Sequence, residues 1–156
     1  MPHTFVIFGA SGDLTSRKLV PALYELFRKG RLPAEPRIVG FSRTRYSNEA
    51  WREELAKTTQ HFVGPDFDAE RWATFASGIF YHPGDVNQGE DFATLARYLD
   101  ELEGPAGAAR IYYLSTAPQF YEPAVAHVGA AGMAGESNGP WRVVIEKPFG
   151  TDLGSA

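Results

Sequence analysis

Two glycines near the N-terminus, Gly9 and Gly12, have the spacing of a phosphate-binding turn. They follow a short apolar run and precede a helix-like pattern. In that context backbone N–H groups and a helix N-terminus bind phosphate. Gly9 would permit the tight turn, and Gly12 would let the backbone approach a pyrophosphate closely. The full G-x-G-x-x-G spacing is missing, so a purely structural turn is the alternative. The position of the motif in the first strand–helix unit favours nucleotide binding.

The residues that follow the second apolar run refine the expected ligand. Sites that prefer NAD usually place an Asp or Glu there for the ribose 2′-OH, whereas this chain has Ser42, Arg43, Thr44 and Arg45. An arginine is always charged and pairs with a phosphate through two parallel hydrogen bonds. We therefore predict NADP rather than NAD, with Arg43 as the main contact and hydroxyl donors from Ser42 and Thr44. A solvated basic loop is the alternative.

Two further residues of the glycine turn have ambiguous roles. Asp13 follows Gly12 directly and could contact the dinucleotide, although capping the following helix explains it equally well. Ser11 resembles a nucleophile only superficially, because the segment is not G-x-S-x-G and no paired His or Asp is identifiable. We do not expect nucleophilic catalysis from it.

The loops after the fourth and fifth apolar runs matter because ligands of open α/β sheets lie at the carboxyl ends of the strands. These loops hold residues 115–118 (Ser-Thr-Ala-Pro) and 146–148 (Glu-Lys-Pro). Lys147 is a candidate contact for an anionic substrate or cofactor, since an ammonium acts as a point charge. An exposed lysine is the alternative, and the isomer of the Lys147–Pro148 bond is left open.

Several other chemistries are not indicated. The sequence has no P-loop motif, no Tyr followed by Lys four places on, and no H-E-x-x-H. Its four histidines lie far apart and it has no cysteine, so we expect no metal site.

Composition indicates an ordinary globular domain. The chain has 156 residues, of which 44% are hydrophobic and 22% charged, and its net charge is −4. This acidic balance gives no global reason to bind nucleic acid or an anionic membrane. No apolar run could span a bilayer, and no signal peptide is recognisable. Together with the absence of cysteine, which suits a reducing compartment, these features lead us to expect a cytoplasmic protein.

Alternating patterns predict the elements that position these residues. Apolar runs indicate strands at residues 5–8, 37–41, 79–81, 111–114 and 142–145. Helical patterns occupy the intervals, including one apolar face at Leu19, Leu23, Leu26 and Phe27. The order predicts a Rossmann-like α/β fold with a doubly wound, mostly parallel sheet and helices on both faces. A helix-start signal at Thr151–Asp152 suggests a longer protein cut short, with a disordered tail as the alternative.

Taken together, these residues resemble the N-terminal part of the glucose-6-phosphate dehydrogenase family. The resemblance runs across essentially the whole chain and is most specific in its last block. The blocks, in family order, are Gly9-Ala10-Ser11-Gly12-Asp13-Leu14, Arg17-Lys18-Leu19 with Pro21, Ile38-Val39-Gly40-Phe41-Ser42-Arg43, Tyr113-Leu114 with Pro118, and Glu146-Lys147-Pro148-Phe149-Gly150-Thr151-Asp152-Leu153.

The resemblance implies oxidation of glucose 6-phosphate at C1 to the 6-phosphogluconolactone, with hydride passed to NADP, as in the pentose phosphate pathway. It implies that the glycine turn holds the dinucleotide, Arg43 meets the 2′-phosphate, Lys147 contacts substrate near the nicotinamide, and Pro148 acts as a hinge. The expected cofactor-binding residues are Gly9, Ala10, Ser11, Gly12, Asp13, Leu14, Ser42, Arg43, Thr116, Pro118, Glu146 and Lys147.

The chain also departs from the family pattern. The block with the general-base histidine and the domain that binds sugar phosphate and forms the dimer are absent from this sequence. We therefore expect a single NADP-binding Rossmann domain over residues 1–156, inactive as an isolated chain, with glucose 6-phosphate a partner only in a full-length context. A free-standing NADP-binding module, acting as a sensor or subunit, is the alternative. A face left without its domain would favour self-association.

Overall fold

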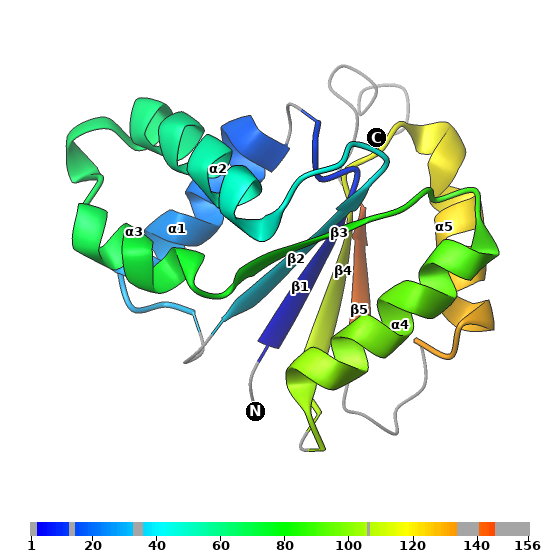
Figure 1. Ribbon diagram of the computed structural model, residues 1–156. Coiled ribbons are helices and arrows are strands. Elements are labelled where there is room, and N and C mark those ends of the chain that lie inside the picture. Colours follow the sequence, from blue (N-terminus) through cyan, green and yellow to red (C-terminus); the bar gives the residue numbers. More distant parts are fainter. Residues whose placement is uncertain (1–2, 13–14, 33–35, 106, 134–140, 146–156) are drawn as a thin grey trace, which may run out of the picture.

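The computed structural model describes residues 3–12, 15–32, 36–105, 107–133 and 141–145, and it alternates strands with helices (Figure 1). A π-helical turn at Thr15–Leu19 precedes the first α-helix, and 3₁₀ turns lie at Gly64–Asp66 and Pro118–Phe120. The main elements are β1 (His3–Phe8), α1 (Val20–Arg28), β2 (Arg37–Ser42), α2 (Asn48–Val63), α3 (Ala69–Ala76), β3 (Ile79–Pro83), α4 (Gly89–Glu103), β4 (Ala109–Leu114), α5 (Tyr121–Ala130) and β5 (Trp141–Ile145).

The five described strands form one parallel sheet in the order β3-β2-β1-β4-β5. The chain winds outward from β1 to β3, then crosses back to place β4 on the other side of β1. The Rossmann-like, doubly wound α/β fold is therefore confirmed. Strand order reverses between β1 and β4, and ligands of such sheets bind at the carboxyl ends of the strands near that reversal.

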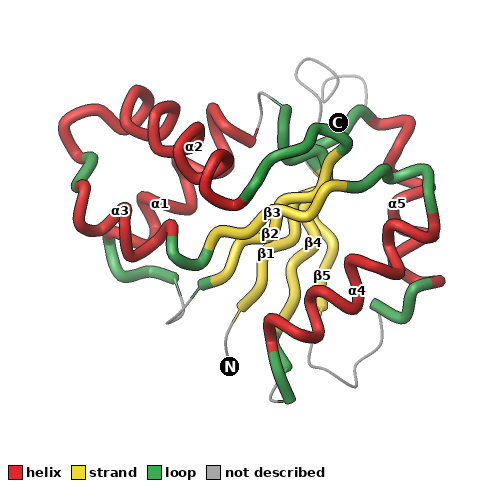
Figure 2. Tube along the Cα trace, viewed as in Figure 1, coloured by secondary structure: helices red, strands yellow, loops and turns green. Residues whose placement is uncertain are grey.

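Helices cover both faces of the sheet, with α1, α2 and α3 on one side and α4 and α5 on the other (Figure 2). Strand residues alternate between the two cores, as the two-residue period of a strand requires. In β1, Phe5 and Ile7 pack toward the first set of helices, and Val6 and Phe8 toward the second. Each face of the sheet thus has its own buried core.

Local signals set several helix ends. The Ser47 side chain accepts a hydrogen bond from the Ala50 N–H at the start of α2, and the Asp68 carboxylate accepts one from the Glu70 N–H at the start of α3. Gly30, just after α1, has a φ of 71°, which closes that helix. Pro21 occupies the first turn of α1, where its missing N–H leaves no intrahelical hydrogen bond unmade.

One prediction about the first helix is wrong. Leu26 is 38% exposed instead of sharing the buried face with Leu19 and Leu23. The physical reason is the position of the buried face of α1, which runs through Val20, Leu23 and Tyr24 with Phe27 packed against the core, so that Leu26 lies to one side of it.

The two edges of the described sheet differ. At the β3 edge, the Tyr81 N–H donates to the Asn48 side chain at 2.7 Å, and Arg52 Nε donates to the Ile79 carbonyl at 2.7 Å. Side chains of α2 thus occupy backbone groups of β3 that would otherwise be open to hydrogen bonds from another strand. At the β5 edge, Trp141 is 40% and Ile145 49% exposed. Among the described residues no helix is long and apolar enough to cross a membrane.

Candidate functional site

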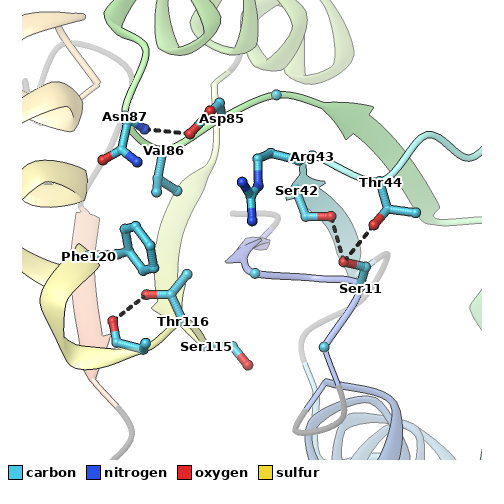
Figure 3. Close-up of a pocket in the computed structure, with 14 residues that line it drawn as sticks. Ser11, Ser42, Arg43, Thr44, Asp85, Val86, Asn87, Ser115, Thr116 and Phe120 are labelled. Atoms are coloured by element: carbon cyan, nitrogen blue, oxygen red, sulfur yellow. Dashed lines mark hydrogen bonds between the residues drawn. The ribbon is translucent and has the colours of Figure 1, made fainter.

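A cavity of about 260 Å³ opens where β1, β2, β3 and β4 end, as Figure 3 shows. Its walls come from the loops that follow these strands, so four segments distant in sequence meet at one place. The lining residues are Gly9, Ser11, Gly12, Ser42, Arg43, Thr44, Gly84, Asp85, Val86, Asn87, Ser115, Thr116, Ala117 and Phe120.

The floor of the cavity is the glycine turn after β1. Gly9 has a φ of 82°, and a Cβ there would lie 2.6 Å from the Ser115 carbonyl oxygen, so no larger residue fits this position. The Gly9 N–H donates to the Phe41 carbonyl at 2.9 Å, and the Gly12 N–H to the Gly9 carbonyl at 3.0 Å. The turn is therefore fixed between β2 and β4. The Ser11 N–H makes no hydrogen bond within the described part of the chain.

A buried threonine ties this turn to the loop after β4. Thr15 is fully buried, and its Oγ1 lies within hydrogen-bond distance of the Gly9 carbonyl oxygen (3.4 Å) and of Ser115 Oγ (3.3 Å). Both partners border the cavity. The two loops on either side of the strand reversal are thus held at a fixed separation before any ligand arrives.

Hydroxyl groups cluster where β2 ends. Ser42 Oγ donates to Ser11 Oγ at 2.9 Å, and Thr44 Oγ1 donates to the same Ser11 oxygen at 3.2 Å (Figure 3). A hydroxyl has two acceptor lone pairs and one donor hydrogen. Because each hydroxyl has a single hydrogen, these groups share their hydrogens within one network at the edge of the cavity.

Tyr81 of β3 supports this cluster from below. Its hydroxyl lies 2.6 Å from Ser42 Oγ and donates to the Thr44 carbonyl oxygen. The ring packs edge-on against Trp51, with centroids 5.1 Å apart, and against Tyr46 at 5.3 Å. Burial raises the pKa of the Tyr81 hydroxyl, against a smaller lowering by its hydrogen bond with Ser42, so the group stays neutral. Sequence reasoning did not find this residue.

Arg43 is the cation of the cavity. Its side chain is exposed, and its guanidinium extends across the opening in Figure 3. No ion pair joins it to another residue in the described ranges, whereas Arg28 and Arg110 both pair with carboxylates. A guanidinium without a counter-ion beside donor hydroxyls is suited to a phosphate dianion.

The loop after β3 forms the remaining wall. The Gly84 N–H donates to the Ser42 carbonyl at 2.8 Å, and a Cβ at Gly84 would lie 2.3 Å from the Phe41 ring. Asp85 is held from both sides. Its N–H donates to Asp91 Oδ2 at 2.8 Å, and its own Oδ1 accepts the Asn87 N–H at 2.9 Å.

The structure brings together half of the residues expected to bind cofactor. Gly9, Ser11, Gly12, Ser42, Arg43 and Thr116 line the cavity. Ala10 is 1% exposed and packs in the core, and Pro118 begins the 3₁₀ turn beside the cavity without lining it. Asp13, Leu14, Glu146 and Lys147 lie outside the described residues, as does Pro148.

Sequence reasoning missed the loop after β3 and the side chain of Phe120. The signal was available for the loop, because the rule applied to the fourth and fifth strands holds equally for the third. Among the described residues, no group of three His, Asp or Glu side chains is placed to hold a metal ion.

Comparison with known proteins assigns the chain to a family. The profile described as "Glucose-6-phosphate dehydrogenase, NAD binding domain" matches residues 6–156. The chain belongs to the glucose-6-phosphate dehydrogenase family. The family resemblance expected from the sequence blocks is therefore confirmed, and the cavity at the strand ends lies in the domain that this family profile describes as NAD-binding.

Individual members of the family are similar over almost the whole chain. The glucose-6-phosphate 1-dehydrogenase of Chlamydia pneumoniae is 39% identical, and that of Treponema pallidum 42%; the match covers 99% of this chain and 31% of either protein. A solved structure described as "Glucose-6-phosphate dehydrogenase in complex with its substrate glucose-6-phosphate" matches with a TM-score of 0.83 at 33% identity, covering 99% of this chain and 32% of that one. The chain thus spans about a third of the length of these relatives.

Proposed function

We propose that residues 1–156 form a single NADP-binding domain and that the dinucleotide lies in the cavity at the ends of β1 to β4. The observation that carries the proposal is the position of Arg43, which has no carboxylate partner in the described ranges, beside the hydroxyl cluster of Ser11, Ser42 and Thr44. Both line the position after β2 where a dinucleotide site meets the ribose 2′ group.

The charge at this position argues for NADP over NAD. A carboxylate would accept hydrogen bonds from a 2′-OH but repel a 2′-phosphate. Here Arg43 supplies two N–H donors and a full positive charge, and the hydroxyls of Ser11 and Thr44 lie beside it. The pyrophosphate would lie over the Gly9–Gly12 turn, near the Ser11 N–H that makes no hydrogen bond within the described ranges.

In a full-length protein this domain would serve a glucose-6-phosphate 1-dehydrogenase, in which bound NADP accepts the hydride from the sugar. We propose that the isolated chain does not carry out that reaction. Removing the hydroxyl proton as hydride leaves needs a positioned base, and no histidine lines the cavity formed by the described residues. Contacts of Lys147 with substrate, and of Asp13, Leu14 and Glu146 with coenzyme, stay predictions. A cytoplasmic location stays one as well.

Calorimetric titration of the purified chain with NADP and with NAD tests the proposal. We expect tighter binding of NADP, and Arg43→Ala should weaken NADP roughly tenfold or more while changing NAD little. Arg45→Ala is the matched control, because Arg45 is an equally exposed arginine two residues on that does not line the cavity. Equal affinities for the two coenzymes, or equal effects of the two substitutions, would contradict the assignment.

The isolated chain should also associate with itself through the β5 edge. Trp141 and Ile145 point to the same face of β5 and are each at least 40% exposed. In an antiparallel pair of two β5 strands centred on Val143, Trp141 would lie opposite Ile145 of the second copy, a favourable aromatic–aliphatic pair. Light scattering should detect this association, and Ile145→Lys should reduce it more than Leu26→Lys. A wild-type chain that stays monomeric at high concentration would refute it.

A further inference from the structure

A second cavity, of about 460 Å³, lies between the π-helical turn at Thr15–Leu19 and α2, on the face of the sheet that α1, α2 and α3 cover (Figure 2). Of the described residues, Ser11 alone lines both this cavity and the one at the strand ends. The part of α2 that lines it, from Trp51 to Phe62, is about 16 Å long at 1.5 Å per residue. It therefore extends well past the position of one phosphate at the end of β2. We call it the α2 groove, and the residues used below are Arg17, Trp51, Glu54, Lys57, His61 and Phe62.

Basic side chains from two elements meet at the α2 groove. Arg17 lines it from the π-helical turn, and Lys57 and His61 line it from α2. Lys57 and His61 are four residues apart, so they are neighbours on one face of the helix. Neither Arg17 nor Lys57 forms an ion pair with a carboxylate in the described ranges, whereas Arg28 and Arg110 do. Two cations without counter-ions, in a chain whose net charge is −4, favour an anionic ligand.

One acid, Glu54, also lines the groove and sets which end is positive. Glu54 and His61 are about two helical turns apart, or roughly 10 Å along the helix axis. The guanidinium of Arg17 lies at the far end from Glu54, because its central carbon is 6.0 Å from the centroid of the Phe62 ring. The positive end of the groove is therefore at His61 and Phe62.

Aromatic surface lies beside these cations. Phe62 is 47% exposed, and the His61 ring packs edge-on against it with centroids 4.8 Å apart. Trp51, which is buried, adds apolar surface to the lining. Binding sites for small molecules combine apolar and aromatic lining with a few polar groups. An exposed ring beside a guanidinium thus suits a ligand that carries both a negative charge and a flat apolar part.

We propose that the α2 groove binds a small organic phosphate, a phosphate monoester with a flat apolar body. Arg17 would pair with two phosphate oxygens through parallel N–H donors, and Lys57 would add a point charge. An imidazole N–H of His61 would donate a further hydrogen bond, and the apolar body would pack on Phe62. A dianion gains more from two cations than a carboxylate does. The inference goes beyond the proposed function and does not depend on NADP binding.

Calorimetric titration of the purified chain with phenyl phosphate tests the proposal. We expect saturable binding that is tighter than the binding of benzoate or of inorganic phosphate. Arg17→Ala should weaken it roughly tenfold or more, as expected for loss of hydrogen bonds to a charged group. Lys57→Ala should weaken it by a smaller factor. Glu54→Gln should strengthen it, because a like charge leaves the groove.

Matched variants separate the groove from other sources of binding. Arg31→Ala removes an equally exposed arginine that does not line the groove, so it should leave the affinity unchanged. Arg43→Ala removes the cation of the coenzyme cavity and should also leave it unchanged. Phe62→Ala should weaken phenyl phosphate more than inorganic phosphate. Thermal unfolding of each variant shows that the chain stays folded, as expected for exposed positions.

Each outcome decides the proposal independently of the coenzyme site. If phenyl phosphate does not bind, the proposal is refuted whether or not NADP binds. If Arg43→Ala weakens phenyl phosphate as much as Arg17→Ala does, the ligand lies in the coenzyme cavity and the groove is refuted. Equal losses for Arg17→Ala and Arg31→Ala would show attraction to general positive charge, which again refutes it. If phenyl phosphate binds with the expected variant pattern while NADP does not bind, the groove stands and the proposed function fails.

Discussion

Replacing Tyr81 by phenylalanine should weaken NADP binding without touching the coenzyme. Tyr81 is 5% exposed and lies beneath the cavity lining, with its hydroxyl on Ser42 Oγ and on the Thr44 carbonyl. Thr44 and Ser42 both donate to Ser11 Oγ. Removal of one buried oxygen therefore takes a partner away from the hydroxyl cluster that we expect to lie beside the 2′-phosphate.

The size of the effect follows from what remains in place. The phenyl ring keeps its packing against Trp51 and Tyr46, so little apolar burial is lost. The Thr44 carbonyl and the Ser42 hydroxyl lose a partner in a buried setting, which costs about 1–3 kcal/mol of the free energy of unfolding. Looser hydroxyls should reduce NADP affinity by roughly three- to tenfold, equivalent to about one hydrogen bond. NAD lacks the 2′-phosphate, so its affinity should change less.

Urea unfolding and calorimetric titration measure the two consequences separately. Tyr112→Phe is the matched control, because the Tyr112 hydroxyl is also buried and donates to the Met133 carbonyl at 2.8 Å, but it lies in the other core. It should lose comparable stability and keep the ratio of NADP to NAD affinity. A Tyr81→Phe variant with an unchanged ratio, or a control that shifts the ratio equally, would refute the link between β3 and coenzyme selectivity.

Three further substitutions test other parts of the structure. Gly9→Ala should cost about 2–5 kcal/mol and abolish NADP binding, because it forces a side chain into positive φ and against Ser115; near-normal urea unfolding would contradict this. Glu103→Leu should cost about 1.5–3 kcal/mol of the free energy of unfolding, since Arg110, 5% exposed, loses its closest carboxylate and keeps Asp100. Burial lowers the pKa of His82, so stability should fall as pH drops below about 6.5, and His82→Gln should flatten that dependence in urea titrations.

The parts of the fold that were predicted correctly are those determined by residues close together in the sequence. The Ser47 and Asp68 caps, the Gly30 helix end and the alternation of strands with helices all act over a few positions. The predicted bounds fell short where strands extend past their apolar runs, as β3 does to Pro83. Leu26 was misplaced because the expected face included it with Leu19 and Leu23, whereas the buried face of α1 runs through Val20, Leu23 and Tyr24.

The site residues that could be predicted are those whose role follows from one strand and the loop after it. Gly9 and Arg43 were found because a turn or a charge at a strand end has a recognisable chemistry. Tyr81 could not be found in this way, because its partner Ser42 lies 39 positions earlier and only the pairing of β2 with β3 brings them together. Asp85 likewise lines the cavity only because β3 lies next to β2 in the sheet. The contribution of a neighbouring strand to a site becomes visible only when the order of the strands is known.

The charges at the ends of β2 and β3 have opposite signs, and we expect this arrangement to favour one orientation of a bound dinucleotide. A guanidinium at Arg43 after β2 would attract the phosphate of the ribose, while the carboxylate of Asp85 after β3 would repel it. A dinucleotide bound in the reverse direction would place its carboxamide ring over the loop after β3 and leave Arg43 without a phosphate. Reversing both charges together, as Arg43→Glu with Asp85→Lys, should therefore abolish the preference for NADP over NAD in calorimetric titrations, whereas the single substitution Asp85→Lys should retain it.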